Sequence, residues 1–215
     1  MVDVKICGIS SPADYLACRA AGARWVGMVY YPGSPRHLDI ATLASLTDQI
    51  ERLPSAGPHR VLLTVDQTLA SLRTLITAAR PDFLQLHGQE TIGSAIAVKA
   101  EFGLPIIKMI PIETSADLAA CAPWEAVADW FIFDAKVTKG TQPGGTGHRF
   151  DWTILSQYKG HTPWMLAGGL TIDTVSEAVT ISGANAVDVS SGVEHQRGKK
   201  DENKIHDFIQ AAQIG

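Results

Sequence analysis

The chain has 215 residues, a length that favours one domain of the larger kind over two of ordinary size. Hydrophobic residues make up 46% and charged residues 19%, a balance that is too apolar for a disordered chain and sufficient for a large core. Eighteen Lys and Arg against twenty-two Asp and Glu give a formal net charge of −4, without a basic block, so we expect no nucleic-acid partner.

Residues 1–8 lack the basic stretch and apolar run of a signal peptide, and no later segment approaches the roughly 20 apolar residues that span a bilayer. We therefore expect a cytoplasmic protein with no membrane partner. The three cysteines, Cys7, Cys18 and Cys121, are an odd number without close spacing, so neither a disulfide framework nor a cysteine zinc site is predicted. A functional cysteine would act as a free thiol.

Short apolar runs alternate with helical patterns along the chain. The apolar runs predict eight strands, at Val2–Cys7, Trp25–Tyr30, Arg60–Val65, Phe83–His87, Ile106–Ile110, Trp130–Asp134, Trp164–Leu166 and Ala186–Ser190. Ser11 and Pro12 are typical of the start of the first helix, and Gly22 lies beyond its end. Pro81 ends a later helix whose apolar spacing begins at Leu69.

The predicted strands recur at nearly regular intervals, as expected of a repeated strand–helix unit. Parallel strands covered on both faces are continuously apolar, as Val61–Val65 and Phe131–Phe133 nearly are. Eight successive units favour a closed (β/α)8 TIM barrel over an open doubly wound sheet. We predict a single α/β domain over residues 1–215, with no linker between domains.

Two of the intervals are longer, and extra residues in such units usually form loops that carry function. The first long interval holds the segment YYPGSPRHLD, in which Arg36 either grips a carboxylate or is simply solvated. The second holds residues 135–152, where the glycines around Gly145 would let the backbone approach a ligand closely.

The carboxyl ends of the strands form the active face of such barrels, so the last polar residue of each strand is a candidate. Lys5 and Cys7 lie two residues apart on the first strand and point to the same side, which we expect to be the barrel mouth. The Lys5 ammonium would favour the Cys7 thiolate, although a buried cysteine is more often a small apolar filler. Cys18 and Cys121 are expected to be structural.

Asp134 ends the sixth strand, where its carboxyl group could donate a proton or pair with a lysine such as Lys136. Strands one and six lie far apart around the ring, so Cys7 and Asp134 would face each other across the mouth as one base and one acid. His87 ends the fourth strand and could donate to a substrate or cap a turn, and the sequence does not decide between these roles.

Two loops after the seventh and eighth strands are rich in glycine and serine, and a helix is predicted to start near Thr171. The loop residues of interest are Gly168, Gly169, Ser190, Ser191 and Gly192. Close backbone approach and a helix N-terminus favour an anion, so these loops predict a phosphate site. No residue cluster has metal-ligand spacing and no loop matches a nucleotide fingerprint, so we expect no metal and no cofactor.

These segments together resemble one family. In chain order they read KICGI, VGMVYYPGSPRHL, DFLQLHGQE, FIFDAKV, PGGTGHRFDW, LAGGL, AVDVSSGVE and GKKD. They match, in order from Lys5 to Phe208, the motifs of the phosphoribosylanthranilate isomerases of tryptophan biosynthesis, which the chain therefore resembles. The resemblance implies a barrel of the ribulose-phosphate-binding type, without a cofactor, that acts on a small phosphosugar. We expect a monomer or a homodimer.

The resemblance also implies an Amadori rearrangement of N-(5-phosphoribosyl)anthranilate to 1-(2-carboxyphenylamino)-1-deoxyribulose 5-phosphate. In this reaction Cys7 would be the general base and Asp134 the general acid, which agrees with the pair expected from the strand ends. The resemblance places Arg36 at the anthranilate end of the substrate.

Further substrate contacts are expected from Lys5, His87 and Asp188, with Asp188 binding the sugar. The resemblance gives the phosphate to the Gly168-Gly169 and Ser190-Ser191-Gly192 loops, and we add Gly145 to that site. The chain departs from the family pattern at the end of the third strand, where Asp66-Gln67 stands in place of a common Asn, and at Ala167, where Ser is frequent. Both departures concern substrate contacts rather than the acid or the base.

Two other functions fit the same residues. The related barrel isomerase of histidine biosynthesis performs the same rearrangement on a larger substrate with two phosphates, but it uses an aspartate as its base where this chain has Cys7. A phosphosugar-binding barrel without catalysis is the second alternative, and the presence of both Cys7 and Asp134 argues against it.

Overall fold

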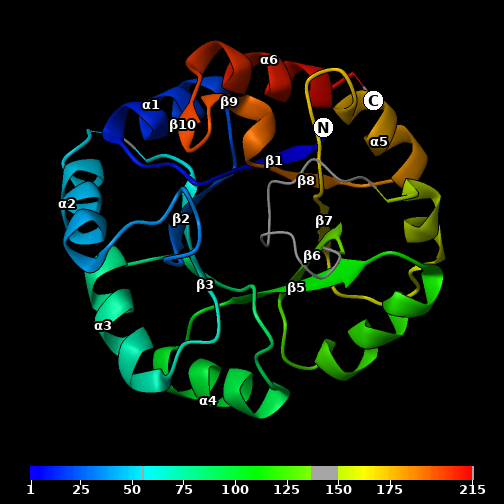
Figure 1. Cartoon of the computed structure of the whole chain (residues 1–215), viewed down its shortest axis with the longest axis horizontal. Coiled ribbons are helices and arrows are strands. Elements are labelled where there is room, and N and C mark those ends of the chain that lie inside the picture. Colours follow the sequence, from blue (N-terminus) through cyan, green and yellow to red (C-terminus); the bar gives the residue numbers. More distant parts are fainter. Residues whose placement is uncertain (55, 137–149, 215) are drawn as a thin grey trace.

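The structure, a computed structural model, describes residues 1–54, 56–136 and 150–214 (Figure 1). Eight parallel strands close into one barrel in chain order, with β1 paired to both β2 and β8. The strands are β1 Asp3–Cys7, β2 Trp25–Tyr30, β3 His59–Thr64, β4 Phe83–Leu86, β5 Ile106–Ile112, β6 Trp130–Ala135, β7 Trp164–Leu166 and β8 Ala186–Val189. The (β/α)8 barrel predicted from the sequence is confirmed, and each predicted strand lies within two residues of an observed one.

Helices form the outer layer of the barrel (Figure 1). They are α1 Pro12–Ala21, α2 Ile40–Glu51, α3 Leu69–Ala79, α4 Ile92–Phe102, α5 Val175–Ser182 and α6 Glu202–Ala212. After β5 and β6 the outer layer instead contains the 3-10 helices η1 Ser115–Trp124 and η2 Trp152–Gln157. Pro123 lies inside η1 and has no backbone N–H to donate, which disfavours a regular α-helix there.

The predicted helix ends are largely confirmed. The Ser11 hydroxyl accepts a hydrogen bond from the backbone of Asp14, whose carboxylate in turn accepts one from the backbone of Ser11. Gly22 ends α1 in the left-handed conformation with φ 87°, and α3 ends two residues before Pro81. The helix predicted to start near Thr171 begins later, at Val175, because residues 171–174 form a turn first.

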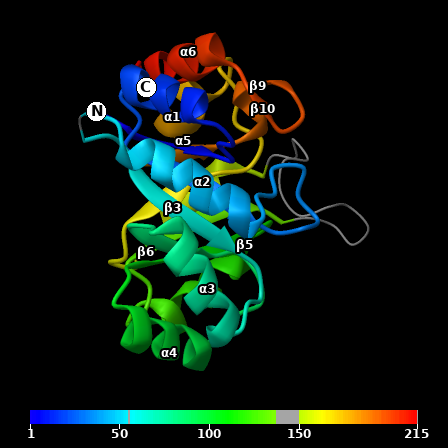
Figure 2. The same cartoon turned by 90° about the vertical axis from the view of Figure 1, so that its left-hand side faces the viewer.

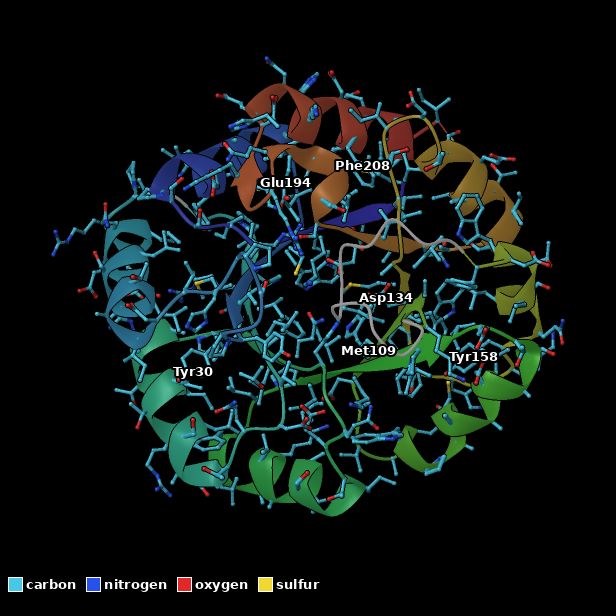
Figure 3. All side chains as sticks on the ribbon, in the orientation of Figure 1. Tyr30, Met109, Asp134, Tyr158, Glu194 and Phe208 are labelled. Atoms are coloured by element: carbon cyan, nitrogen blue, oxygen red, sulfur yellow. The ribbon has the colours of Figure 1, made fainter. Side chains whose placement is uncertain are left out.

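Side chains on the strands alternate between two cores. One set, including Val4 and Ile6 of β1, points outward and is buried under the helices. The other set fills the ring from within, and its fully apolar members are Trp25, Val61, Ile107, Ile132, Met165, Ala167 and Ala186. In Figure 3, Asp134 and Met109 lie inside the ring, whereas Phe208 and Tyr158 lie between the ring and the helices. The interior is a packed core, so a site can form only above it.

The carboxyl ends of the strands carry one structure that the sequence did not predict. After the short 3-10 helix η3 Ser191–Val193, strands β9 Glu194–Gln196 and β10 Lys199–Lys200 form a separate antiparallel hairpin. Figure 2 shows this hairpin at the same end of the barrel as the loop that follows β2. Over the described residues, none of the helices has the length and apolar character needed to cross a membrane.

The packing of α6 on the outside of the barrel gives a prediction about stability. Phe208 of α6 is fully buried, and the helix packs against α1 and β1. Truncation at this position removes apolar contacts and leaves a cavity, so Phe208→Ala should lower the free energy of unfolding by about 3–5 kcal/mol in a urea titration. Ile214, near the end of the chain and 79% exposed, is the control, and Ile214→Ala should change it by less than about 0.5 kcal/mol. Equal effects of the two substitutions would contradict this role of Phe208.

Candidate active site

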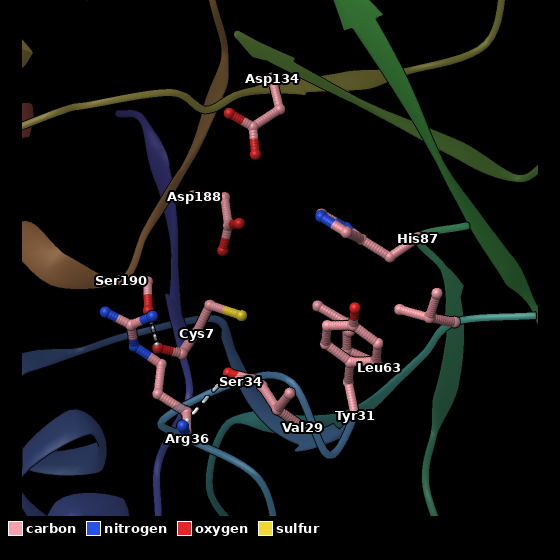
Figure 4. A pocket seen from close by; sticks show the side chains of 11 residues that line it. Cys7, Val29, Tyr31, Ser34, Arg36, Leu63, His87, Asp134, Asp188 and Ser190 are labelled. Atoms are coloured by element: carbon pink, nitrogen blue, oxygen red, sulfur yellow. Dashed lines mark hydrogen bonds between the residues drawn. The ribbon is translucent and has the colours of Figure 1, made fainter. Parts of the chain in front are cut away.

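A cavity opens at the carboxyl ends of the strands, above the packed interior (Figure 4). The residues that line it are Cys7, Val29, Tyr31, Ser34, Arg36, Leu63, Val65, His87, Asp134, Asp188 and Ser190. They come from six of the eight strands or from the loops that follow them. A second hollow adjoins the first and shares Tyr31, Val65, His87 and Asp134 with it. Most of the side chains predicted from the sequence therefore meet at one place.

Cys7 and Lys5 occupy successive inward positions of β1 but different depths. Cys7 lines the cavity, whereas Lys5 is fully buried one layer deeper and donates from Nζ to Oδ1 of Asp188 at 2.9 Å. The expectation that Lys5 lies at the mouth is therefore wrong. Burial lowers the pKa of the ammonium, but the interactions with Asp188 and Cys7 together outweigh this effect, so the pKa of Lys5 is raised and the charge is retained.

The Lys5 ammonium favours the thiolate of Cys7, as expected, but it is not the largest influence on this thiol. Burial raises its pKa, and the opposing charge of Lys5, which favours the thiolate, does not reverse the direction. These surroundings therefore favour the thiol form of Cys7. Cys18 and Cys121 are buried away from the cavity, and burial raises the pKa of each to about 12, which fits the structural role predicted for them.

Asp134 lies inside the ring near the end of β6, and Figure 4 shows its carboxyl group pointing into the cavity. Burial, with a further contribution from the negative charge of Asp188, raises the pKa of Asp134 to about 6. Lys136, the alternative partner, instead extends to Asp117 at 3.3 Å and Glu113 at 3.7 Å. The structure therefore favours the proton-donor interpretation of Asp134 over the ion-pair interpretation.

The ring of His87 points into the cavity from the end of β4 (Figure 4). Its Nδ1 lies 3.0 Å from Nε2 of Gln85, which is buried in the barrel interior. Burial, together with the charge of Lys5, lowers the pKa of His87 to about 4, so the ring is neutral near pH 7. An amide donor at Nδ1 leaves the ring proton on Nε2, where it can be donated to a ligand. This geometry favours the ligand-donor role over the turn-cap role.

Arg36 is not a solvated surface residue. It is only 7% exposed, and its guanidinium donates two hydrogen bonds to Glu194, from Nε at 2.6 Å and from Nη2 at 2.9 Å. The carboxylate that Arg36 grips within the protein is therefore that of Glu194, in the β9–β10 hairpin. Arg36 nevertheless lines the cavity on the same side as Cys7 and Ser190 (Figure 4).

The two glycine and serine loops lie side by side, as predicted. Gly168 has φ 91°, and a Cβ at this position would lie 2.8 Å from the backbone nitrogen of Ala135, so only glycine fits there. The backbone of Gly192 closely approaches the carbonyl oxygen of Leu170, which joins the loop after β8 to the loop after β7. Ser190 donates from its hydroxyl to the carbonyl oxygen of Cys7 at 2.9 Å. Gly145 lies outside the described residues.

Two charged residues that the sequence analysis gave no role lie behind the cavity lining, in contact with Arg36 and Ser190. Glu194 is buried against Arg36, and Lys200 donates to Glu194 and to the carbonyl oxygen of Ser190. Both residues fall in the quoted segments AVDVSSGVE and GKKD, but nothing in the local pattern shows that these segments fold into a hairpin beside Arg36. In the described parts of the chain, no cluster of three or more His, Cys, Asp or Glu side chains could hold a metal ion.

The family model described as N-(5'phosphoribosyl)anthranilate (PRA) isomerase matches residues 4–211. The chain belongs to this isomerase family. Among its relatives, the N-(5'-phosphoribosyl)anthranilate isomerase of Nitrobacter hamburgensis is 49% identical, with 97% of this chain and 92% of the relative covered. The protein of the same name from Rhodopseudomonas palustris strain BisA53 is 46% identical, with 98% and 95% covered.

Solved structures agree with the family assignment. The phosphoribosyl anthranilate isomerase of Thermotoga maritima superimposes with a TM-score of 0.86 at 30% identity, covering 99% of both chains. Another similar structure, with a TM-score of 0.84, 28% identity and 99% of both chains covered, is a phosphoribosyl anthranilate isomerase in complex with reduced 1-(o-carboxyphenylamino)-1-deoxyribulose 5-phosphate. The fold and family expected from the sequence are thus confirmed, and the chain is an isomerase of tryptophan biosynthesis.

The raised pKa of Asp134 predicts how stability depends on pH. The folded protein holds this proton up to about pH 6, against an ordinary pKa of 3.8, so the ionised carboxylate destabilises the fold above that range. This destabilisation is absent well below pH 4, grows as the pH rises from 4 to 6, and is complete above 6. Asp134→Asn should therefore exceed wild type in free energy of unfolding by about 1–3 kcal/mol at pH 8, with little difference at pH 4, in urea titrations.

Asp39 serves as a control, because its substitution should change the free energy of unfolding in the opposite direction at high pH. It is an exposed cap of α2, and hydrogen bonds from Thr42 lower its pKa, so its charge stabilises the fold above its ordinary pKa of 3.8. Asp39→Asn should accordingly lose stability at pH 8, and the loss should disappear as the pH falls below 3. An Asp134→Asn difference that stays constant between pH 4 and pH 8 would contradict the raised pKa.

Proposed function

We propose that this chain converts N-(5-phosphoribosyl)anthranilate to 1-(2-carboxyphenylamino)-1-deoxyribulose 5-phosphate, with Asp134 as the general acid and Cys7 as the general base. The observation that carries the proposal is that these two side chains, from β6 and β1, line one cavity in a chain of this isomerase family. An Amadori rearrangement needs one group that gives a proton to the ring oxygen of the sugar and one that takes a proton from C2′.

Asp134 is suited to the first step. A pKa of about 6 keeps about a tenth of this carboxyl group protonated at pH 7, whereas an aspartate with the ordinary pKa of 3.8 would be less than about a thousandth protonated. Transfer of its proton to the ring oxygen of the ribose allows the bond between that oxygen and C1′ to break. The nitrogen lone pair then forms a cationic Schiff base with C1′, and Asp134 is left as a carboxylate.

Cys7 is suited to the second step. Its pKa is raised by burial, but the Schiff base produced by ring opening places a positive charge beside C2′. That charge, together with the ammonium of Lys5, favours loss of the thiol proton of Cys7 to solvent, which leaves the thiolate. The same charge acidifies the C2′ proton. Cys7 then takes the C2′ proton to give an enolamine. The enolamine accepts a proton at C1′ and loses one from the 2′ hydroxyl, which yields the ketone without net change in protons.

The remaining contacts hold the substrate at its two ends. Arg36 faces the anthranilate end, and the neutral His87 donates from Nε2. Asp188 accepts from Lys5 through Oδ1 and presents the rest of its carboxylate to the cavity, where it would accept from a sugar hydroxyl. Lys5 therefore contributes through Asp188 and Cys7 rather than by direct contact.

The phosphate would bind to the adjacent loops of Gly168-Gly169 and Ser190-Ser191-Gly192. Their close packing supports this assignment, because backbone N–H groups at the carboxyl ends of strands seven and eight are a common phosphate site in barrels of this class. Phosphate binding anchors the substrate without joining the reaction, so it lowers the barrier by fixing the reacting atoms near the acid and the base. The oligomeric state and the cytoplasmic location stay predictions.

Substitution of the acid and the base tests the proposal. Cys7→Ala and Asp134→Asn should each lower kcat by at least about a hundredfold, because each removes one proton-transfer step. Turnover is followed as the loss of anthranilate-type fluorescence after phosphoribosylanthranilate is generated in situ. Both variants should still bind reduced 1-(o-carboxyphenylamino)-1-deoxyribulose 5-phosphate within about threefold of wild type in calorimetry, since neither residue anchors the ligand.

Matched controls separate these roles from structural effects. Cys18→Ala removes a buried thiol outside the cavity and Asp173→Asn removes an exposed carboxylate, so both should keep near-normal turnover. Variants at Cys7 or Asp134 that lost binding and turnover together would contradict the assigned roles. A folded wild-type protein that bound the product analogue without any turnover would instead be a phosphosugar-binding barrel, and turnover of the histidine-pathway intermediate at comparable efficiency would point to the related isomerase.

A further inference from the structure

Beside the cavity lies a buried cluster of three charged side chains whose arrangement the proposed reaction does not by itself require. Arg36 comes from the loop after β2, Glu194 begins β9 and Lys200 ends β10, and each is at most 8% exposed. Burying charged groups is costly unless they are paired and hydrogen-bonded. The presence of such a buried charged cluster beside a site therefore requires an explanation.

Glu194 is the centre of this cluster. Its Oε1 accepts from Nε of Arg36 at 2.6 Å and from Nζ of Lys200 at 2.9 Å. Its Oε2 accepts from Nη2 of Arg36 at 2.9 Å and from the backbone N–H of Gly198 at 3.0 Å. With two donors on each oxygen, the carboxylate is well satisfied and directs its bonds to the protein, so it acts on a ligand only through its partners.

Arg36, in contrast, is only partly used by this pair. The two parallel bonds to Glu194 engage Nε and one hydrogen of Nη2, out of the five N–H donors of a guanidinium. Two planar groups joined by parallel bonds cannot rotate independently, so Glu194 fixes the plane in which the remaining donors of Arg36 lie. Those donors belong to a side chain that lines the cavity together with Ser34 and Cys7 (Figure 4).

The charge balance of the cluster favours an anionic ligand. Two cations, Arg36 and Lys200, share the single carboxylate of Glu194, which leaves one positive charge in excess in this cluster, and Arg36 lines the cavity. A carboxylate on the ligand would balance this excess and accept the outward donors of Arg36. The phosphate is assigned to other loops, so the group that suits this position is the carboxylate of the anthranilate ring.

Two glycines allow the backbone to pack closely around Arg36 and the loop that carries it. Gly8 follows Cys7 with φ 83°, and a Cβ there would lie 2.5 Å from Cδ of Arg36, so the arginine stem packs directly on the backbone after the base. Gly198, with φ 79°, turns the hairpin so that a Cβ there would lie 2.6 Å from the carbonyl oxygen of Pro35. The hairpin and the loop after β2 are thus held against each other.

We propose that Glu194 is a positioning residue that fixes the guanidinium of Arg36 so that its outward donors bind the carboxylate of the substrate's aromatic ring. This inference rests on the proposed isomerase function and goes beyond it, because it assigns substrate selectivity to the β9–β10 hairpin. It implies that Glu194 raises kcat/KM only for a substrate that carries this carboxylate. A purely structural role of Glu194 would affect all substrates alike.

A pair of substrates that differ only in this group tests the inference. One is N-(5′-phosphoribosyl)anthranilate, and the other is the corresponding aniline compound, which lacks the ring carboxylate. Ketose product from both is quantified by chromatography, for wild type and for Glu194→Gln. On the anthranilate substrate the variant should lose about ten- to a hundredfold in kcat/KM, mainly through KM, because a charge-assisted contact is weakened. On the aniline substrate it should lose less than about threefold.

Two further variants keep the inference testable if Glu194→Gln folds poorly. Glu194→Asp keeps the charge but withdraws the carboxylate from the guanidinium, and it should show the same selective loss at smaller size. In an Arg36→Met background, Glu194→Gln should change kcat/KM on the anthranilate substrate by less than about twofold, because the group that it positions is already absent. Glu202→Gln removes an exposed carboxylate close by in the chain and is the control for charge alone.

The outcomes are distinct. A loss that appears only with the carboxylate-bearing substrate, and only while Arg36 is present, would support the inference. Equal losses on both substrates would show a structural role for Glu194, and no loss on either would show no role, so both results overturn it. Folded wild-type protein that turns over neither substrate would remove the proposed function itself, and this inference with it.

Discussion

Every strand of this barrel is buried on both faces, and the two-residue period of a β-strand decides what each face carries. Outward positions pack under the helices, and inward positions fill the ring in layers. A shift of one residue in any strand would exchange these two sets and move Cys7, Asp134 or Asp188 out of the ring. The site thus depends on strand register, which the apolar packing on both faces enforces.

The interior layers also set the electrostatics of the site. Trp25, Ile132 and their neighbours fill the lower part of the ring and exclude water from beneath the cavity. Lys5 and Asp188 lie above this apolar layer as a buried ion pair, with Nζ and Oδ1 2.9 Å apart. In these surroundings the charged form of a nearby acid is disfavoured, which explains why an aspartate at the end of a strand acquires a pKa of about 6. The burial that stabilises the barrel interior is therefore also the cause of the raised pKa of Asp134.

Besides strand register, the small hairpin that follows β8 also determines how the residues of the site are arranged. It brings Glu194 and Lys200 to Arg36, although Arg36 and Glu194 are 158 residues apart in the sequence. The same hairpin reaches the loop after β8, because Lys200 donates to the carbonyl oxygen of Ser190. One element outside the barrel thus links the side of the site assigned to the aromatic ring with the loop assigned to the phosphate.

The amino-acid sequence by itself determined the barrel, its strands and the residues that end them, because these follow from local apolar patterns, caps and breakers such as Ser11 and Pro81. It also placed Cys7 and Asp134 at strand ends, and its motifs led to the family. Only the tertiary structure showed that Lys5 lies below the mouth, that the Cys7 thiol has a raised pKa, and that Arg36 is buried against Glu194. These properties depend on depth in the ring and on contacts between distant segments, which no local pattern encodes.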